Sequence, residues 1–259
     1  MSASAVVTEP MIYGPVEFDW DVKNGAITTS AKTTGKYLQE WARDTTEQKI
    51  IILFGENTLT FSAALCSLLN VDGAFSRTPL VLPTVYESPD VSDSLVSPET
   101  LAQLGVFRSQ SRSFLDISMG VLHGVNATEI HLSHSPLHAV FPTVKVSYFM
   151  WNFPFTGEDD NIDAQKNLIL GFFFSASRLI MRKKIEDVAN VPKILLTLCN
   201  DQAQRWDVES LARSQMLVIT KSWPFDISEF RRYQPTRNSS VDFFPVEFPV
   251  TYEFSYSNR

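Results

Sequence analysis

One stretch of the chain constrains its fold more than any other: residues 49–62, which read KIIILFGENTLTFS. The consecutive apolar residues Ile50–Leu53 are typical of a strand buried on both faces, as central parallel strands are. Gly55 ends this run. From Thr60 onward apolar residues recur at helical spacing, so we expect the chain to turn from strand directly into helix. Such a βα unit with a glycine turn predicts a parallel sheet, whose strand ends commonly bind nucleotide-like ligands.

Strand and helix patterns continue to alternate along the rest of the chain. Helices are predicted between the strands, the longest over residues 162–181. The sequence therefore predicts an α/β fold in which a mostly parallel seven-stranded sheet carries helices on both faces. Five parallel strands and a final pair, whose last strand is antiparallel, are predicted at residues 50–54, 79–84, 119–128, 145–151 and 193–199, then 215–220 and 248–255.

Bulk properties point to a globular intracellular protein. We expect one large domain over residues 49–259, preceded by an N-terminal extension, residues 1–48, with a short edge strand at 16–20 and a helix at 31–42. Two isolated cysteines argue against a disulfide framework. No apolar run approaches the roughly 20 residues that a membrane span needs. The net charge of -7 argues against nucleic-acid binding by bulk electrostatics.

Polar side chains follow three of the predicted strands and are candidate ligand contacts. Glu87 comes after the second strand, where an acidic residue in nucleotide-binding folds accepts hydrogen bonds from ribose hydroxyls, although a lone loop glutamate is more often merely solvated. Asn126 follows the third strand and could face an adenine edge. After the strand at 145–151 comes the stretch 152–155, Asn-Phe-Pro-Phe, whose proline could also simply end the strand. A loop of aromatics and arginines, residues 223–233, is a further candidate for substrate contact.

Three histidines, His131, His134 and His138, have a spacing that would suit a zinc site on a helix. Pro136 interrupts that helix, and no cysteine or suitably placed carboxylate completes a ligand set. We therefore expect no metal site.

Several sequence blocks, taken together and in order, resemble the Rossmann-like family of eukaryotic 25S rRNA uridine-N3 methyltransferases. The likeness runs from Lys49 to the end of the chain, about four-fifths of its length. Its first block is the glycine loop, matched at Gly55, Glu56, Phe61 and Ser62. The others are TVYES at 84–88, LHGVNAT at 122–128, NFP at 152–154 and PFD at 224–226.

This resemblance implies an S-adenosylmethionine-dependent methyltransferase that acts on a base of RNA. The implied cofactor residues are Gly55, Glu56 and Asn57 at the amino acid end, Glu87 at the ribose and Asn126 at the adenine. The implied catalytic residues, which would grip the extruded base, are Asn152, Phe153, Pro154 and Phe155. The implied partner is RNA, ribosomal and within an assembly, in the nucleolus or cytoplasm, with an organelle as the alternative.

Departures from the family pattern leave a second function open. Asn57 and Thr58 stand where the family has glycine and aspartate, so a backbone expected to need glycine's positive φ carries a side chain here. Asn126 replaces an aspartate and Phe155 a histidine. The alternative is a catalytically inactive methyltransferase-like protein that serves as a binding or scaffold part of an RNA–protein assembly.

Overall fold

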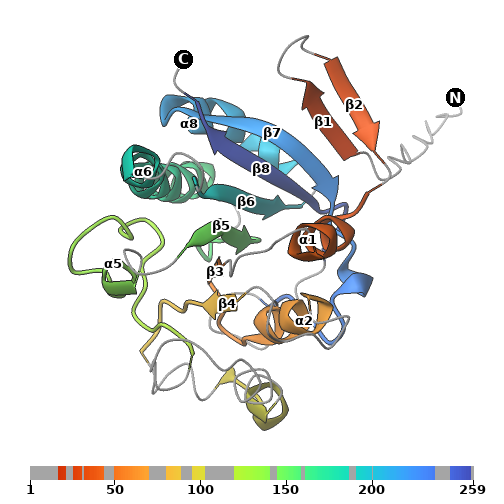
Figure 1. Cartoon of the computed structure of the whole chain (residues 1–259), viewed down its shortest axis with the longest axis vertical. Coiled ribbons are helices and arrows are strands. Elements are labelled where there is room, and N and C mark those ends of the chain that lie inside the picture. The colour runs from red at the N-terminus through yellow and green to blue at the C-terminus, as the bar shows by residue number, and fades with distance from the viewer. Residues whose placement is uncertain are drawn as a thin grey trace, which may run out of the picture.

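A single mixed β-sheet forms the centre of the molecule. The structure is a computed structural model, and it describes residues 17–21, 26–30, 32–43, 50–69, 80–88, 95–102, 120–140, 145–158, 161–186, 191–199, 201–236 and 246–257. In these residues the sheet has eight strands, in the order β2-β1-β7-β8-β6-β5-β3-β4 (Figure 1). The strands are β1 (Glu17–Asp21), β2 (Ala26–Ser30), β3 (Ile50–Phe54), β4 (Leu80–Pro83), β5 (Val146–Asn152), β6 (Lys193–Leu198), β7 (Leu217–Pro224) and β8 (Val250–Tyr256).

The sheet differs from the predicted one in strand number and direction. β4, β3, β5 and β6 are parallel neighbours, whereas β8 is antiparallel to both β6 and β7, and β1 is antiparallel to β7 and β2. Three of the seven pairings in the described part are thus parallel, so the prediction of a mostly parallel seven-stranded sheet is wrong. Antiparallel neighbours can be joined by short reversals, and the hairpin β1–β2 adds two such strands beyond β7.

One predicted strand is reduced to a single bridge. Within the described part of residues 119–128, only Leu122 pairs with the sheet, through an isolated parallel bridge to Thr84. Gly120 and Gly124, with φ of 64° and 68°, interrupt the extended backbone on either side. At the other end of the sheet, the predicted edge strand corresponds to β1, which is covered by β2 and is therefore not an edge.

Helices cover both faces of the sheet, as predicted. One layer holds α1 (Thr34–Arg43) and α2 (Thr60–Leu69), and the other holds α6 (Ile162–Glu186) and α8 (Val208–Ser214) (Figure 1). Alternate residues of β3 serve the two layers: Ile50, Ile52 and Phe54 belong to the core under α6, while Ile51 and Leu53 pack with α1 and α2. The shorter elements are α5 (Pro136–Val140), α7 (Gln202–Arg205) and η3 (Ile227–Glu229).

Residues before the first central strand share the sheet and core of the rest of the chain. β1 pairs with β7, and fully buried Leu38 of α1 lies in the same core cluster as residues of α2. The division into an extension, residues 1–48, and a domain, residues 49–259, stays a prediction. Within the ranges described, none of the helices has the length and apolar character needed to span a bilayer.

Candidate active site

The loop after β3 is shaped by a glycine that no other residue could replace without strain. Gly55 has a φ of 71°, and a Cβ at this position would lie 2.7 Å from Nε1 of Trp151 on the adjacent strand β5. Both the left-handed backbone and the indole above it therefore require glycine. Its backbone comes close to the end of β5, which brings the loops after two strands together.

Glu56 joins this loop to the start of α2. Its carboxylate accepts hydrogen bonds from the backbone N–H of Ser62, at 2.9 Å, and from the Ser62 hydroxyl, at 2.6 Å. Leu59, which precedes the helix, has no side-chain acceptor, so Glu56 supplies the cap that α2 would otherwise lack. Burial raises the pKa of Glu56 to about 7, although the two bonds from Ser62 act in the opposite direction.

Asn57 and Thr58 fit the loop without a left-handed backbone. The positive φ values here belong to Gly55 and, at 55°, to Leu59, whereas Asn57 and Thr58 have none. The expectation that Asn57 occupies a position that needs glycine is therefore wrong: the loop reverses at Leu59, which is buried in a small apolar cluster with Val85. Asn57 and Thr58 instead turn toward a cavity, which they help to line.

The segments that follow β4 and Leu122 run side by side. Val85 donates its N–H to Leu122 O at 3.0 Å, and Val125 donates to Val85 O at 2.9 Å, which places Glu87 and Asn126 next to each other in the fold. The side-chain oxygen of Asn126 accepts bonds from the N–H and the hydroxyl of Thr128, at 3.0 and 2.8 Å. Because that oxygen is used within its own turn, Asn126 has only its N–H groups to offer a ligand.

The loop after β5 carries the predicted Asn-Phe-Pro-Phe stretch. Asn152 Oδ1 accepts a hydrogen bond of 2.6 Å from the hydroxyl of Thr197 on β6. Phe153 has a φ of 51°, an uncommon value for a bulky residue, and its ring meets that of Phe225 edge-on at 5.6 Å. Strained backbone of this kind is concentrated at functional sites.

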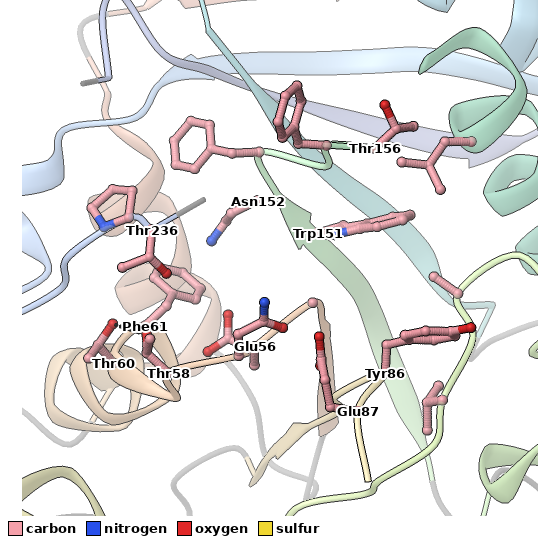
Figure 2. Close-up of a pocket in the computed structure, with 18 of the residues that line it drawn as sticks. Glu56, Thr58, Thr60, Phe61, Tyr86, Glu87, Trp151, Asn152, Thr156 and Thr236 are labelled. Carbon is pink, nitrogen blue, oxygen red and sulfur yellow. Dashed lines mark hydrogen bonds between the residues drawn. The ribbon is translucent and has the colours of Figure 1, made fainter. Parts of the chain in front are cut away.

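These loops surround one cavity of about 930 Å³, near the upper end of the roughly 300–1,000 Å³ typical of small-molecule sites. Figure 2 shows Asn152 and Trp151 on one side and Glu56 and Glu87 on the other. Of the predicted site residues only buried Pro154 is absent from the lining. Those that do line the cavity are Gly55, Glu56, Asn57, Glu87, Asn126, Asn152, Phe153 and Phe155.

Sequence reasoning missed part of the lining. Trp151 and Tyr86 each precede a predicted residue by one position, and Tyr86 is 68% exposed at the cavity. For both Trp151 and Tyr86, the sequence signal is an aromatic residue immediately before a polar residue at the end of a strand. Tyr233, Gln234, Pro235 and Thr236 supply the wall that faces the first loop.

Most aromatics of the stretch 223–233 belong to the core instead of the cavity. Trp223, Phe225 and Phe230 are buried, and the rings of Phe225 and Phe230 stack with centroids 4.7 Å apart. Within this loop, only Tyr233 and the residues that follow it therefore remain candidates for contact with substrate.

The histidines whose spacing would suit one face of a helix contact different residues. His131 Nδ1 lies 2.8 Å from the hydroxyl of Ser175 on α6, while His134 Nε2 lies 3.6 Å from a carboxylate oxygen of Glu129 at the surface. Among the described residues, no three potential metal ligands lie together.

The sequence of residues 52–237 matches the BMT5-like family, described as rRNA (uridine-N3-)-methyltransferase BTM5-like. The chain belongs to this family. The match covers well over half of the chain and includes every predicted site residue. Membership in the BMT5-like family confirms both the suspected resemblance and the expected function, an RNA methyltransferase, and the uridine-N3 type agrees with the family's description. No curated protein matches the chain in sequence.

Solved structures similar to this BMT5-like chain are methyltransferases by their descriptions. A candidate RNA methyltransferase from Pyrococcus horikoshii has a TM-score of 0.45 and 12% identity, with 87% of this chain and 82% of that one covered. The 16S rRNA methyltransferase KamB has a TM-score of 0.35 and 10% identity, with coverages of 94% and 100%. The glycopeptide N-methyltransferase MtfA, in complex with sinefungin, has a TM-score of 0.38 and 12% identity, with coverages of 88% and 89%. At these scores the matches add nothing to the fold described above.

Proposed function

We propose that this chain binds S-adenosylmethionine in the cavity and methylates N3 of a uridine in ribosomal RNA. The observation that carries the proposal is the convergence of three strand-end loops on one cavity, with carboxylates after β3 and β4 opposite the Asn-Phe-Pro loop after β5. In parallel α/β folds, ligands bind at this edge of the sheet. The BMT5-like family supports the choice of rRNA and of N3.

The residues present fit the chemical groups of this cofactor. The backbone of Gly55 lines the cavity, and the carboxylates of Glu56 and Glu87 match an ammonium group and a ribose diol. Asn126 suits ring nitrogens of adenine, which accept hydrogen bonds, because its own oxygen is engaged by Thr128. The exocyclic amine of adenine needs an acceptor elsewhere.

When bound, the cofactor would supply a methyl group carried on positively charged sulfur. Transfer of this methyl group to N3 would break the carbon–sulfur bond and leave its electrons on sulfur, while the N3 proton would go to water. The chain's own contribution is positioning, since such a transfer needs in-line approach and no covalent nucleophile. Phe153 and Phe155 offer aromatic surface to an extruded base. The RNA is presented within a ribosome-related assembly, in the nucleolus or cytoplasm.

Calorimetric titration with S-adenosylmethionine and S-adenosylhomocysteine tests the proposal. We expect binding that Glu87→Ala weakens about 10- to 100-fold, because hydrogen bonds to a charged group contribute about 1.5–3 kcal/mol. Glu209→Ala, which removes an exposed carboxylate on α8 outside the cavity, is the matched control and should bind like the wild type. Mass spectrometry of nucleosides from treated rRNA should then detect N3-methyluridine. No heat and no thermal shift at millimolar ligand would support the inactive alternative instead.

A further inference from the structure

A line of buried hydroxyl groups leads from Asn152, the candidate base-binding residue, to helix α1. Thr197 Oγ1 donates to Asn152 Oδ1 at 2.6 Å, and it lies 2.9 Å from Thr251 Oγ1 on β8. Thr34 Oγ1 of α1 donates to Thr251 Oγ1 at 2.9 Å and lies 3.1 Å from Pro224 O. All three threonines are 0% exposed, so each hydroxyl depends on the others for its hydrogen bonds.

This line fixes which end of the Asn152 amide faces the cavity. The separation of 2.6 Å suits an O–H···O bond and is shorter than the about 2.7–3.2 Å of N–H···O bonds, so the amide oxygen is the atom at Thr197. The amide nitrogen of Asn152 points into the cavity (Figure 2). The side chain therefore presents its N–H donors to whatever base lies beside it.

Thr197 also holds the next residue of the loop. Its backbone carbonyl accepts the N–H of Phe153 at 2.9 Å, the residue with the left-handed backbone. A single residue of β6 thus fixes the amide of Asn152 through its side chain and the strained turn through its main chain. A substitution at Thr197 can therefore remove the side-chain bond to Asn152 and keep the main-chain bond to Phe153.

We propose that Thr197 is a positioning residue that holds Asn152 with its N–H donors toward the substrate base, and that this arrangement selects uracil over cytosine. The inference rests on the proposed function. N3 of uracil lies between the C2 and C4 carbonyl groups, which gain negative charge as the N3 proton leaves, and an Asn152 N–H donor aimed at the C4 oxygen stabilises that charge. Cytosine has an amino group in place of the C4 oxygen, so the donor would face another donor and remain unpaired.

Thr197→Val tests the proposal, because valine keeps the shape of threonine and removes only the hydroxyl. We expect kcat on a uridine substrate to fall at least 10-fold, the preference for uridine over cytidine in RNA binding to fall, and affinity for S-adenosylhomocysteine to stay unchanged. Thr197→Ser should restore both kcat and preference. Thr84→Val is the matched control: this threonine is also 0% exposed at a strand end, but its hydroxyl has no hydrogen-bond partner among the described residues.

A spectroscopic measurement keeps the test independent of turnover. In the ¹⁵N spectrum, the Asn152 side-chain amide, assigned by its loss in Asn152→Asp, should shift in Thr197→Val and keep its position in Thr84→Val. If Thr197→Val does not fold, the same signal in Thr251→Val, one bond further along the line, should still move away from its wild-type position. A wild type that neither binds cofactor nor methylates RNA would contradict the proposed function. An active wild type with Thr197→Val indistinguishable from Thr84→Val would overturn the positioning role alone.

Discussion

Glu56 combines a structural and a candidate ligand-binding role in one carboxyl group. It caps α2 through Ser62 and lines the cavity, and it is only 8% exposed. Burial favours the neutral acid, which explains the pKa of about 7 against an ordinary value of 4.5. Because the folded state holds this proton more tightly than the unfolded chain does, the contribution of Glu56 to stability is complete below pH 4.5 and is lost as the pH rises through 7.

Glu56→Gln should therefore remove one component of the pH dependence. Glutamine keeps an acceptor for Ser62 but does not titrate, so the difference in unfolding free energy between variant and wild type should change by up to about 3 kcal/mol from pH 4.5 to 7.5. Urea unfolding across this range measures the difference. Parallel profiles for the two proteins would show that Glu56 is not the titrating group.

At the scale of elements, the start of α1 is tied to the loop that closes the cavity. Glu229 of η3 accepts hydrogen bonds from the Thr33 hydroxyl at 2.6 Å and from the Gly35 N–H at 3.1 Å. The same loop continues into Tyr233 and Thr236, which line the cavity. We therefore expect movement at the first turn of α1 to be coupled to one wall of the cavity.

Glu229→Ala should lower the free energy of unfolding by about 1–2 kcal/mol, the usual effect of removing a helix cap. Amide exchange should accelerate in the first turn of α1 and in residues 233–236. Glu209→Ala, which removes only an exposed pair with Arg213, should change stability by less than about 0.5 kcal/mol. Equal effects of the two substitutions would argue against a stabilising contact between Glu229 and the start of α1.

Sequence reasoning predicted elements where burial leaves a local signature. β3 and β6 are apolar runs because both of their faces are covered, and residues after parallel strands meet at one edge, so strand-end residues such as Glu87 and Asn152 are predictable, whereas Glu56 and Asn57 come only from the family resemblance. β2 reads AITTS and has no such run. Nor does any local pattern distinguish Thr197, whose hydroxyl donates to Asn152, from Thr84, whose hydroxyl has no partner within the part of the chain that the structure describes. Only the assembled sheet reveals that difference.

At the scale of the whole molecule, the charge of -7 limits how the chain meets RNA. Affinity for nucleic acid comes mainly from Lys and Arg at phosphates. We expect the isolated protein to bind an rRNA fragment weakly, and more weakly still when salt rises from about 50 to 200 mM. Fluorescence anisotropy at the two salt concentrations measures this. Tight binding that salt leaves unaffected would contradict it and would remove the need for a partner to deliver the RNA.

The place of β8 in the sheet bears on the order in which the molecule is completed during synthesis. β8 follows every other described strand in the chain, yet it lies between β6 and β7. Without residues 250–256, β7 and the hairpin β1–β2 have no described strand through which to join the parallel strands β4, β3, β5 and β6. We therefore expect a chain that lacks β8 to form two separate sheet fragments, each with an additional unpaired edge.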